Sequence, residues 1–176
     1  FTTVSTGGFS THSDSIAAFD SWVVELAVIV GMVLSGANFA LYFRLVRGEP
    51  GWAAGNRELH AYLGIIVTGT VLMTASLYVF DYQDSLALAF RESLFQSVSF
   101  LTGTAFSIAD WSSWDPLSQG LLMLFMAIGG MAGSTSGGLK VIRTVLLARH
   151  AGQEVFRMVH PHAVTPLKLG ERIVPE

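Results

Sequence analysis

Three apolar runs dominate the chain, and each has about the length that a membrane-spanning helix needs. They cover residues 26–43, 61–80 and 117–139, and none contains a charged residue. A helix rises about 1.5 Å per residue, so a run of about 20 residues matches a hydrocarbon core of about 30 Å. The pattern predicts three spanning helices. Gly31 and Asn38 interrupt the first run and favour close packing of that helix against its neighbours.

A fourth apolar segment, residues 85–99, is too short to cross a membrane and carries Arg91 and Glu92. It leads directly into the sequence FLTGTAFS at residues 100–107. Irregular backbone at membrane depth must be buried in protein or line water. The segment therefore predicts a re-entrant helix, with a helix lying flat in the membrane interface as the alternative.

The sequence FLTGTAFS echoes the opening of the chain, FTTVSTGGFS at residues 1–10. Both stretches combine small hydroxyl residues with glycines and close on Phe-Ser. An extended backbone of this kind can direct several carbonyl oxygens at one cation and replace its hydration shell. Either stretch alone could be an ordinary polar turn. The candidate filter residues are Val4, Ser5, Thr6, Gly7, Gly8, Leu101, Thr102, Gly103, Thr104 and Ala105.

The second half of the third run reads GGMAGSTSGGLK at residues 129–140. Glycine costs about 1 kcal/mol relative to alanine inside a helix, so this composition predicts a broken helix and a movable constriction. Hydrogen bonds from its three hydroxyl side chains to the backbone would hold the loop. Its last residue, a lysine, is either an electrostatic barrier or a positive-inside anchor. The candidate gate residues are Gly129, Gly130, Gly133, Ser134, Thr135, Ser136, Gly137, Gly138 and Lys140.

Composition supports a membrane protein, because 51% of the 176 residues are hydrophobic and 13% are charged, with a mean hydropathy of +0.52. The absence of cysteine excludes disulfides and thiolate metal sites. The start at Phe1, without the features of a signal peptide, indicates a fragment of a longer protein. No arrangement of residues predicts a catalytic site, so we expect no enzyme activity.

Neither a phosphate-binding loop nor a histidine metal site fits the sequence. The glycine-rich stretch does not fit the phosphate-binding pattern G-x-x-x-x-G-K-[ST], because Leu139 stands before the lysine and Val141 follows it. His150, His160 and His162 are interpreted as loop histidines and not as metal ligands.

Basic residues are distributed unevenly along the chain. Of the ten Lys and Arg residues, nine lie in the 44–58 loop or after Leu139, and Arg91 stands apart. Basic loops remain in the cytoplasm, so this loop and the tail are expected inside and both Gly/Thr stretches outside. Eight of the thirteen acids fall on the outer side, where an acidic mouth would concentrate cations, although random scatter is the alternative.

The order of filter, two spanning helices, pore helix, filter and broken helix resembles the Trk/Ktr/HKT superfamily of potassium transporters, in particular membrane pore subunits of the TrkH/KtrB type. Residues 3–10 are similar to the family's second filter, and residues 95–110 to its third pore helix and filter. Residues 129–140 resemble the intramembrane loop after that filter, and residues 160–170 the cytosolic link to the fourth repeat.

The resemblance implies an all-α membrane protein of four M1-P-M2 repeats around one pore, located in the inner membrane as a multi-pass protein. Residues 1–58 would hold the second filter, its M2 helix and a cytosolic loop, residues 59–150 most of the third repeat, and residues 151–176 a cytosolic connector. Within this fragment the family pattern is three spanning helices plus one re-entrant pore helix.

The resemblance also implies potassium uptake, a homodimer in membrane lipid, and a cytosolic nucleotide-binding regulatory subunit of the TrkA/KtrA type. It implies K⁺ as the transported ion, no cofactor in this chain and no nucleic acid. The family pattern has glycine directly before the phenylalanine of the third filter, where this chain has Ala105. A sodium- and potassium-permeable member of the superfamily therefore stays open, as do symport with another ion and a secondary transporter with a substrate site at a broken helix.

Overall fold

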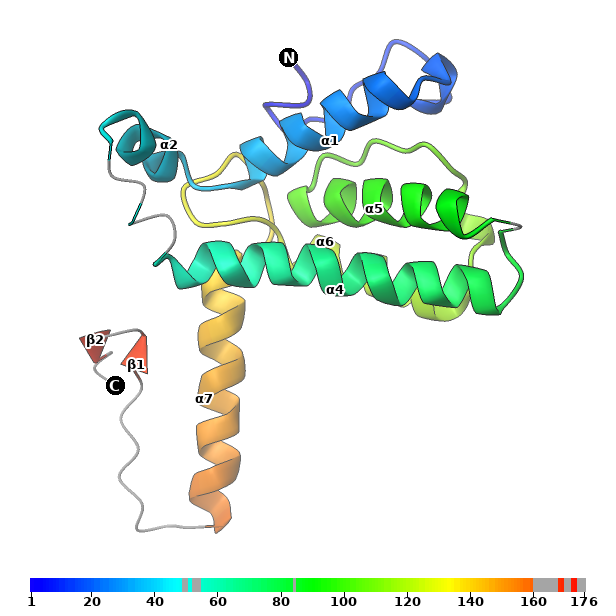
Figure 1. Cartoon of the computed structure of the whole chain (residues 1–176). Coiled ribbons are helices and arrows are strands. Elements are labelled where there is room, and N and C mark those ends of the chain that lie inside the picture. Colours follow the sequence, from blue (N-terminus) through cyan, green and yellow to red (C-terminus); the bar gives the residue numbers. More distant parts are fainter. Residues whose placement is uncertain (49–50, 52–54, 84, 160–167, 170–171, 174–176) are drawn as a thin grey trace.

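The computed structural model describes residues 1–48, 51, 55–83, 85–159, 168–169 and 172–173. The described chain is helical apart from one short strand pair in the tail (Figure 1). The longer helices are α1 (Trp22–Gly36), α2 (Phe39–Val46), α4 (Arg57–Val79), α5 (Leu86–Thr102), α6 (Pro116–Ile128) and α7 (Val141–Val159). The short elements are the 3₁₀ turns η1 (Ala17–Phe19) and η2 (Trp111–Ser113), and the antiparallel strands β1 (Lys168–Leu169) and β2 (Arg172–Ile173). The predicted all-α fold class is confirmed.

Helix α5 lies inside a bundle of four helices. It contacts α1, α4 and α6, and α4 also contacts α6. The largest fully buried side chains are Tyr62, Phe95, Met32, Met73, Leu77 and Leu101. A helix that enters the bilayer without crossing it must have its end covered by protein, and α5 has this cover on three sides. The packing therefore favours the re-entrant interpretation over a helix lying flat on the surface.

Helix α4 is the one helix of the described residues that is long and apolar enough to cross a membrane by itself. It covers residues 61–79 of the predicted run 61–80 and begins four residues earlier. The side-chain oxygen of Asn56 accepts hydrogen bonds from the N–H groups of Glu58 and Leu59 at 2.9 and 3.2 Å. This cap satisfies two of the N–H groups that a helix leaves unpaired at its start.

The run 26–43 does not form the single continuous helix that its composition predicts. α1 ends at Gly36, α2 begins at Phe39, and the two helices are bent by 95° at the break. Asn38 starts α2 by accepting a hydrogen bond from the N–H of Ala40 at 2.8 Å. The two helices meet the length of one span only when they are taken together.

The third run breaks where its glycines begin, as predicted. α6 covers 13 residues and ends at Ile128, and a loop leads from there to α7. Asp115 caps α6 and accepts hydrogen bonds from the hydroxyl of Ser76 and the N–H of Ser118 at 2.8 and 3.0 Å. Burial raises the pKa of Asp115, but hydrogen bonds from Ser118 and Ser76 outweigh it and the net shift is downward. The cap is therefore ionised at neutral pH.

Helix α7 begins beside α4 and then leads away from the other helices (Figure 1). The boundary predicted between the third repeat and the connector, after residue 150, falls inside α7. The structure does not test this boundary, and it stays a prediction. The proposed link at residues 160–170 lies outside the described residues except for β1.

Candidate functional site

The two Gly/Thr stretches, nearly a hundred residues apart in sequence, lie in direct contact. A methyl group on Gly8 would place its carbon 2.1 Å from the carbonyl oxygen of Thr104 and 3.7 Å from the carbonyl carbon of Ala105. Only a hydrogen atom fits between the two backbones at this point. The fold therefore brings the two candidate filter segments to one place.

The second stretch begins as the end of helix α5. Gly103 has a φ of +70° and donates its N–H to the carbonyl of Phe100 at 3.1 Å, and the N–H of Thr104 reaches the carbonyl of Ser99 at 3.0 Å. These two bonds form the Schellman arrangement that ends many helices. Leu101 and Thr102 are the last residues of the helix and fully buried. The prediction of extended backbone there is wrong, because α5 continues three residues past residue 99.

The first stretch makes the same arrangement of hydrogen bonds. The N–H of Thr6 donates to the carbonyl of Thr3 at 3.3 Å, and that of Gly7 to the carbonyl of Thr2 at 3.0 Å. Thr6 has a φ of +50°, in the place that Gly103 takes in the second stretch. Residues 2–6 therefore form turns, and the extended backbone predicted for residues 4–6 is wrong.

The two stretches also share a second left-handed position, directly before Phe-Ser. Gly8 has a φ of +66° and Ala105 a φ of +59°. Left-handed backbone costs roughly 1–2 kcal/mol for a residue with a side chain and little for glycine. Ala105 stands where the family pattern has glycine. The backbone there keeps the left-handed conformation that Gly8 has in the first stretch.

The backbone after α5 presents carbonyl groups that the described chain leaves unpaired. In the described residues, no hydrogen bond ends on the carbonyl oxygens of residues 103, 104 and 105. A side chain of α5 holds the turn in place, because the hydroxyl of Ser99 donates to the carbonyl of Phe106 at 2.6 Å. The hydroxyls of Thr102 and Thr104 are 2.9 Å apart and both residues are fully buried. Backbone oxygens held in this way can act as cation ligands.

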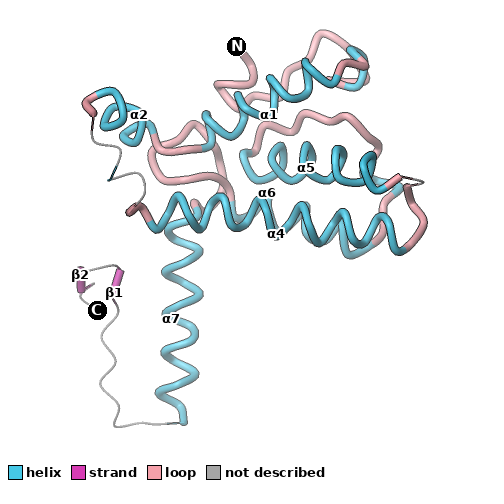
Figure 2. Tube along the Cα trace, viewed as in Figure 1, coloured by secondary structure: helices cyan, strands magenta, loops and turns pink. Residues whose placement is uncertain are grey.

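The glycine-rich stretch 129–140 forms a closed loop between α6 and α7 (Figure 2). Its two ends are joined, because the N–H of Lys140 donates to the carbonyl of Ile128 at 2.8 Å and that of Val141 to the carbonyl of Gly130 at 3.0 Å. Gly129 has a φ of +76°, and a methyl group there would lie 2.2 Å from the carbonyl oxygen of Gly137. Glycine is required at this joint by both conformation and space.

The loop docks into the break between α1 and α2. The N–H groups of Met131 and Thr135 donate to the carbonyls of Gly36 and Ser35 at 2.9 and 3.4 Å, and the N–H of Phe39 donates to the carbonyl of Gly133 at 3.1 Å. The last carbonyls of a helix have no partner within the helix. The loop supplies those partners, which explains why the first apolar run breaks at this point.

The loop also touches the first filter stretch. The hydroxyl of Thr135 shares its one proton between the carbonyl of Val4 at 2.9 Å and that of Ser35 at 3.2 Å. The hydroxyl of Thr6 donates to the carbonyl of Thr135 at 3.0 Å. Thr135 thus joins the candidate gate to the candidate filter by its side chain and its backbone.

The remaining side chains of the loop hold it together internally. The hydroxyl of Ser134 donates to the carbonyl of Met131 at 2.6 Å, and Ser136 accepts from the N–H of Gly130 at 2.8 Å. These contacts agree with the predicted bonds between hydroxyl groups and the backbone. The ammonium group of Lys140 donates to the carbonyl of Ser136. The positive charge of Lys140 therefore lies against a carbonyl oxygen of the loop.

Three contact residues of the loop were not identified from the sequence. Glu58, near the start of α4, accepts a hydrogen bond from the N–H of Ala132 at 2.7 Å. Ser35 and Asn38 line the break that receives the loop, and Asn38 lies against Gly133. Asn38 was visible as a polar residue inside an apolar run, whereas nothing in the sequence marked Glu58.

Two of the acids predicted to lie at an acidic outer mouth, Glu25 and Asp115, are buried. Glu25 is 3% exposed, and its two carboxylate oxygens accept from the guanidinium of Arg91 at 2.6 and 2.5 Å. Asp115 is 4% exposed and serves as the cap of α6. The charge of Glu25 is paired with Arg91, and Asp115 is engaged as a helix cap, so both acids hold helices in place.

Metal coordination by side chains has no support in the part of the chain that the structure describes, where no three His, Asp or Glu residues form a cluster. His150 lies in α7, which corrects its assignment to a loop. His160 and His162 lie outside the described residues.

Comparison with known proteins gives the same architecture. The chain matches the family described as "TrkH: Cation transport protein" over residues 1–48 and 63–176. The chain belongs to the TrkH family. It is 37% identical to the Trk system potassium uptake protein TrkH of Salmonella typhimurium across its whole length, and 32% identical to TrkG of Escherichia coli across 99% of it.

A solved structure of the TrkH family has the same fold. The crystal structure of the potassium transporter TrkH from Vibrio parahaemolyticus superimposes with a TM-score of 0.91 at 35% identity, covering 96% of this chain and 37% of that one. The chain spans little more than a third of the length of the relatives it matches. It is thus part of a multi-pass membrane protein with M1-P-M2 repeats, in a family of cation transporters.

Proposed function

We propose that this TrkH-family chain is the central part of a pore through which potassium enters the cell. The observation that carries the proposal is the contact of Gly8 with Thr104, which sets two similar helix-ending turns side by side. Turns of this kind, repeated around an axis, present backbone oxygens to one dehydrated cation. Residues 4–8 and 103–105 would form two quarters of the ring, and repeats outside this chain the other two.

The glycine-rich loop would act as the gate below the filter. Its contacts with Val4, Thr6 and the helix break support this role, because a movement of the loop alters the surroundings of the filter directly. The many glycines give the loop a low cost of rearrangement. The gate residues would be the glycines, hydroxyl residues and lysine of the loop 129–140.

The orientation and partners are parts of the same proposal. The filter turns would face outward, with the 44–58 loop and the C-terminal tail in the cytoplasm, as the basic residues indicate. The complete protein would be a homodimer in the inner membrane, controlled by a cytosolic nucleotide-binding subunit of the TrkA/KtrA type. K⁺ would be the transported ion, with no cofactor bound by this chain.

The test of the function uses the full-length protein that contains this chain. Its expression in bacteria without their own potassium uptake should restore growth at low external potassium, and purified protein in liposomes should carry K⁺ or Rb⁺. Flux that saturates with an organic substrate and carries no ionic current would instead establish a secondary transporter. Equal fluxes of Na⁺ and K⁺ would establish a non-selective member of the superfamily.

Replacing Ala105 with glycine should relieve strain in the second filter turn. The φ of +59° suits glycine, so we expect the free energy of unfolding to rise by up to about 1 kcal/mol and the selectivity for K⁺ over Na⁺ to increase. Thermal unfolding in detergent and ion competition in liposomes measure the two effects. Ala127→Gly, at an exposed position inside α6, is the control and should destabilise by about 1 kcal/mol. The prediction is wrong if both variants lose stability equally.

Replacing Thr135 with valine should weaken the attachment of the gate to the filter. The change keeps the shape of the side chain and removes the one hydroxyl proton that the carbonyls of Val4 and Ser35 share, a bond worth about 1 kcal/mol. We expect the steady-state K⁺ flux to rise several-fold, measured in liposomes of the full-length protein. Thr144→Val in α7 removes only a local bond to Lys140 and should leave the flux unchanged. An unchanged flux in the Thr135 variant would remove this residue from the gate.

A further inference from the structure

The chain continues after each filter turn as a short limb, and the two limbs are bonded to each other. The first limb is residues 8–17 and the second limb is residues 105–110. The segment between α5 and α6 turns back from the end of α5 and runs along this helix (Figure 1). The N–H of Ile16 donates to the carbonyl of Ser107 at 3.1 Å, and the N–H of Ser107 donates to the hydroxyl oxygen of Ser15 at 3.1 Å. The limbs therefore join the two filter turns at a second place.

Ser15 is held in an unfavourable conformation at this junction. It has a φ of +56°, in the left-handed region that residues with a side chain avoid. Its hydroxyl is the acceptor for the second limb. Strain of this kind persists only where the surrounding structure enforces it, and it is concentrated at functional sites. The contact between the limbs is therefore a candidate for a functional role.

Gln96 binds this junction from helix α5. Its amide nitrogen donates to the hydroxyl oxygen of Ser107 at 2.8 Å and to the carbonyl of Ala109 at 3.1 Å. A carbonyl can only accept, so the nitrogen of the amide must be the atom that faces Ala109. The hydroxyl of Ser107 donates to the same carbonyl at 2.6 Å. The N–H, the carbonyl and the hydroxyl of Ser107 are thus all engaged, which fixes this residue in one position.

The bonds of Gln96 are not needed to satisfy its partners. Without Gln96, the carbonyl of Ala109 would keep the hydroxyl of Ser107 as its donor. Gln96 itself is 0% exposed, and among the described residues its side-chain oxygen has no hydrogen-bond partner. Burying an unpaired amide oxygen is unfavourable, so an apolar side chain of similar size would cost little stability here. The amide is therefore better explained by what it positions than by what it stabilises.

We propose that Gln96 is a positioning residue for the selection of K⁺ over Na⁺. By fixing Ser107 it sets the spacing of the two limbs, and the carbonyl oxygens of residues 103–105 lie directly before or at the start of the second limb. A filter distinguishes cations by the number and placement of the oxygens around them. A shift of Ser107 would therefore change how well the filter discriminates. This inference rests on the proposed potassium pore and adds to it a residue outside the filter and the gate.

The test measures selectivity and stability of the full-length protein in parallel. Competition of Na⁺ with Rb⁺ uptake in liposomes gives the selectivity as a ratio, which does not depend on the fraction of protein that is folded. Gln96→Leu should reduce this ratio roughly fivefold, the factor that corresponds to one hydrogen bond of ordinary strength. Its midpoint of thermal unfolding in detergent should stay within about 3 °C of the wild type. A purely structural residue would give the opposite result, with a lower midpoint and an unchanged ratio.

Two serine variants form a matched pair for the same measurement. Ser107→Ala and Ser97→Ala each remove one hydroxyl group. Ser107 belongs to the junction, whereas Ser97 is a fully buried residue of α5 whose hydroxyl has no partner among the described residues. Ser107→Ala should reduce the ratio by a similar factor to Gln96→Leu, and Ser97→Ala should leave it unchanged. If Gln96→Leu does not fold, this pair decides the question.

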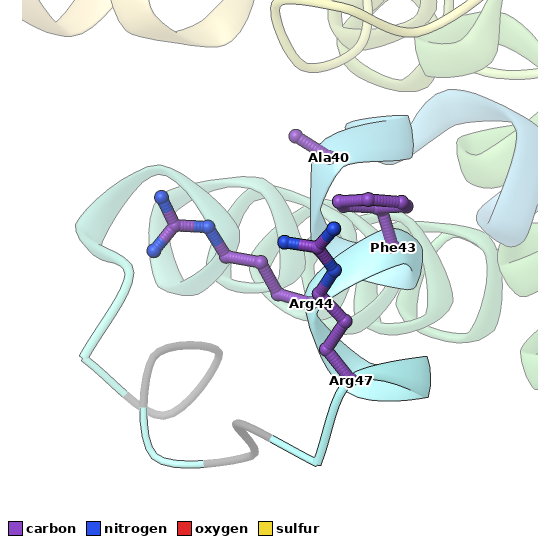
Figure 3. A pocket seen from close by; sticks show the side chains of 4 residues that line it. All are labelled: Ala40, Phe43, Arg44 and Arg47. Carbon is purple, nitrogen blue, oxygen red and sulfur yellow. The ribbon is translucent and has the colours of Figure 1, made fainter.

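A further control lies on the surface of helix α2. A hollow of about 450 Å³ there is lined by Ala40, Phe43, Arg44 and Arg47, none of which belongs to either limb (Figure 3). Phe43 is 59% exposed. Phe43→Leu should leave the selectivity ratio unchanged, which separates an effect of the junction from a general response to substitution.

Three results would overturn the inference. Wild-type selectivity in Gln96→Leu and in Ser107→Ala would show that the junction does not position the filter. An equal loss in Ser97→Ala or Phe43→Leu would show a general sensitivity of the protein to substitution. A wild-type protein that does not prefer K⁺ would overturn the pore proposal together with this inference. The wild-type measurement therefore separates a failure of the proposed function from a failure of the role of Gln96.

Discussion

Replacing Gly8 with alanine should lower K⁺ uptake of the full-length protein by roughly tenfold or more and reduce its preference for K⁺ over Na⁺. The new methyl carbon would lie 2.1 Å from the carbonyl oxygen of Thr104, at a φ of +66°. The two filter turns must separate to accept it, and a cost above about 1.4 kcal/mol corresponds to a factor of ten in rate. Rb⁺ uptake with Na⁺ competition in cells lacking other potassium transporters measures both effects.

The control for this prediction is Gly64→Ala. Gly64 lies in α4 with no atom within 4 Å of the added methyl group, and alanine is the better helix former. Uptake by this variant should equal that of the wild type at equal protein level. If Gly8→Ala is folded and transports K⁺ selectively at the normal rate, the contact between the two turns is not part of the conduction path.

Replacing Gly129 with alanine should destabilise the protein by about 2–3 kcal/mol. The residue has a φ of +76°, and the added methyl carbon would lie 2.2 Å from the carbonyl oxygen of Gly137. The strain of the left-handed conformation adds to the displacement of the joint that closes the loop. The measurement is thermal unfolding of the full-length protein in detergent, together with the K⁺ flux of the fraction that folds.

Gly137→Ala in the same loop is the matched control. Gly137 has no atom within 4 Å of an added methyl group, so this change should alter stability by less than about 0.5 kcal/mol. Similar loss of stability in both variants would mean that the joint at Gly129 is not closed as described. A stable Gly129→Ala variant with altered flux would place the effect on gating alone.

The sequence predicted the elements whose cause is local. Apolar runs gave α4, α5 and α6 nearly in full, and the glycines after Ile128 predicted the break after α6. Gly103 at the end of α5 is an ordinary helix-ending glycine. The equivalent turn at Thr6 could not be predicted, because threonine at positive φ is held by its surroundings and leaves no mark in the sequence.

The elements that the sequence missed depend on distant contacts. α1 ends at Gly36 because the loop after α6 supplies a partner to its carbonyl, and Met131 is 95 residues further along the chain. The hydrogen bond between Glu58 and Ala132 likewise joins residues far apart in the sequence, so no local pattern predicts it. The two candidate filter stretches lie in contact, as predicted, but residues 101 and 102 proved to be helical. Gly103 was a local signal for the end of α5, but the stretch around it was interpreted as extended backbone.

The docking of the loop into the helix break links any opening to hydration. In the proposed gating movement, the carbonyl groups of Ser35 and Gly36 would lose the N–H groups of Thr135 and Met131, and lipid has no donor to replace them. Leaving such groups bare costs about 1–3 kcal/mol each. Water would therefore have to fill the space as the loop leaves, so that hydration of the cavity and displacement of the loop would be one event. Osmotic stress, which removes water from narrow cavities, should accordingly favour the closed form.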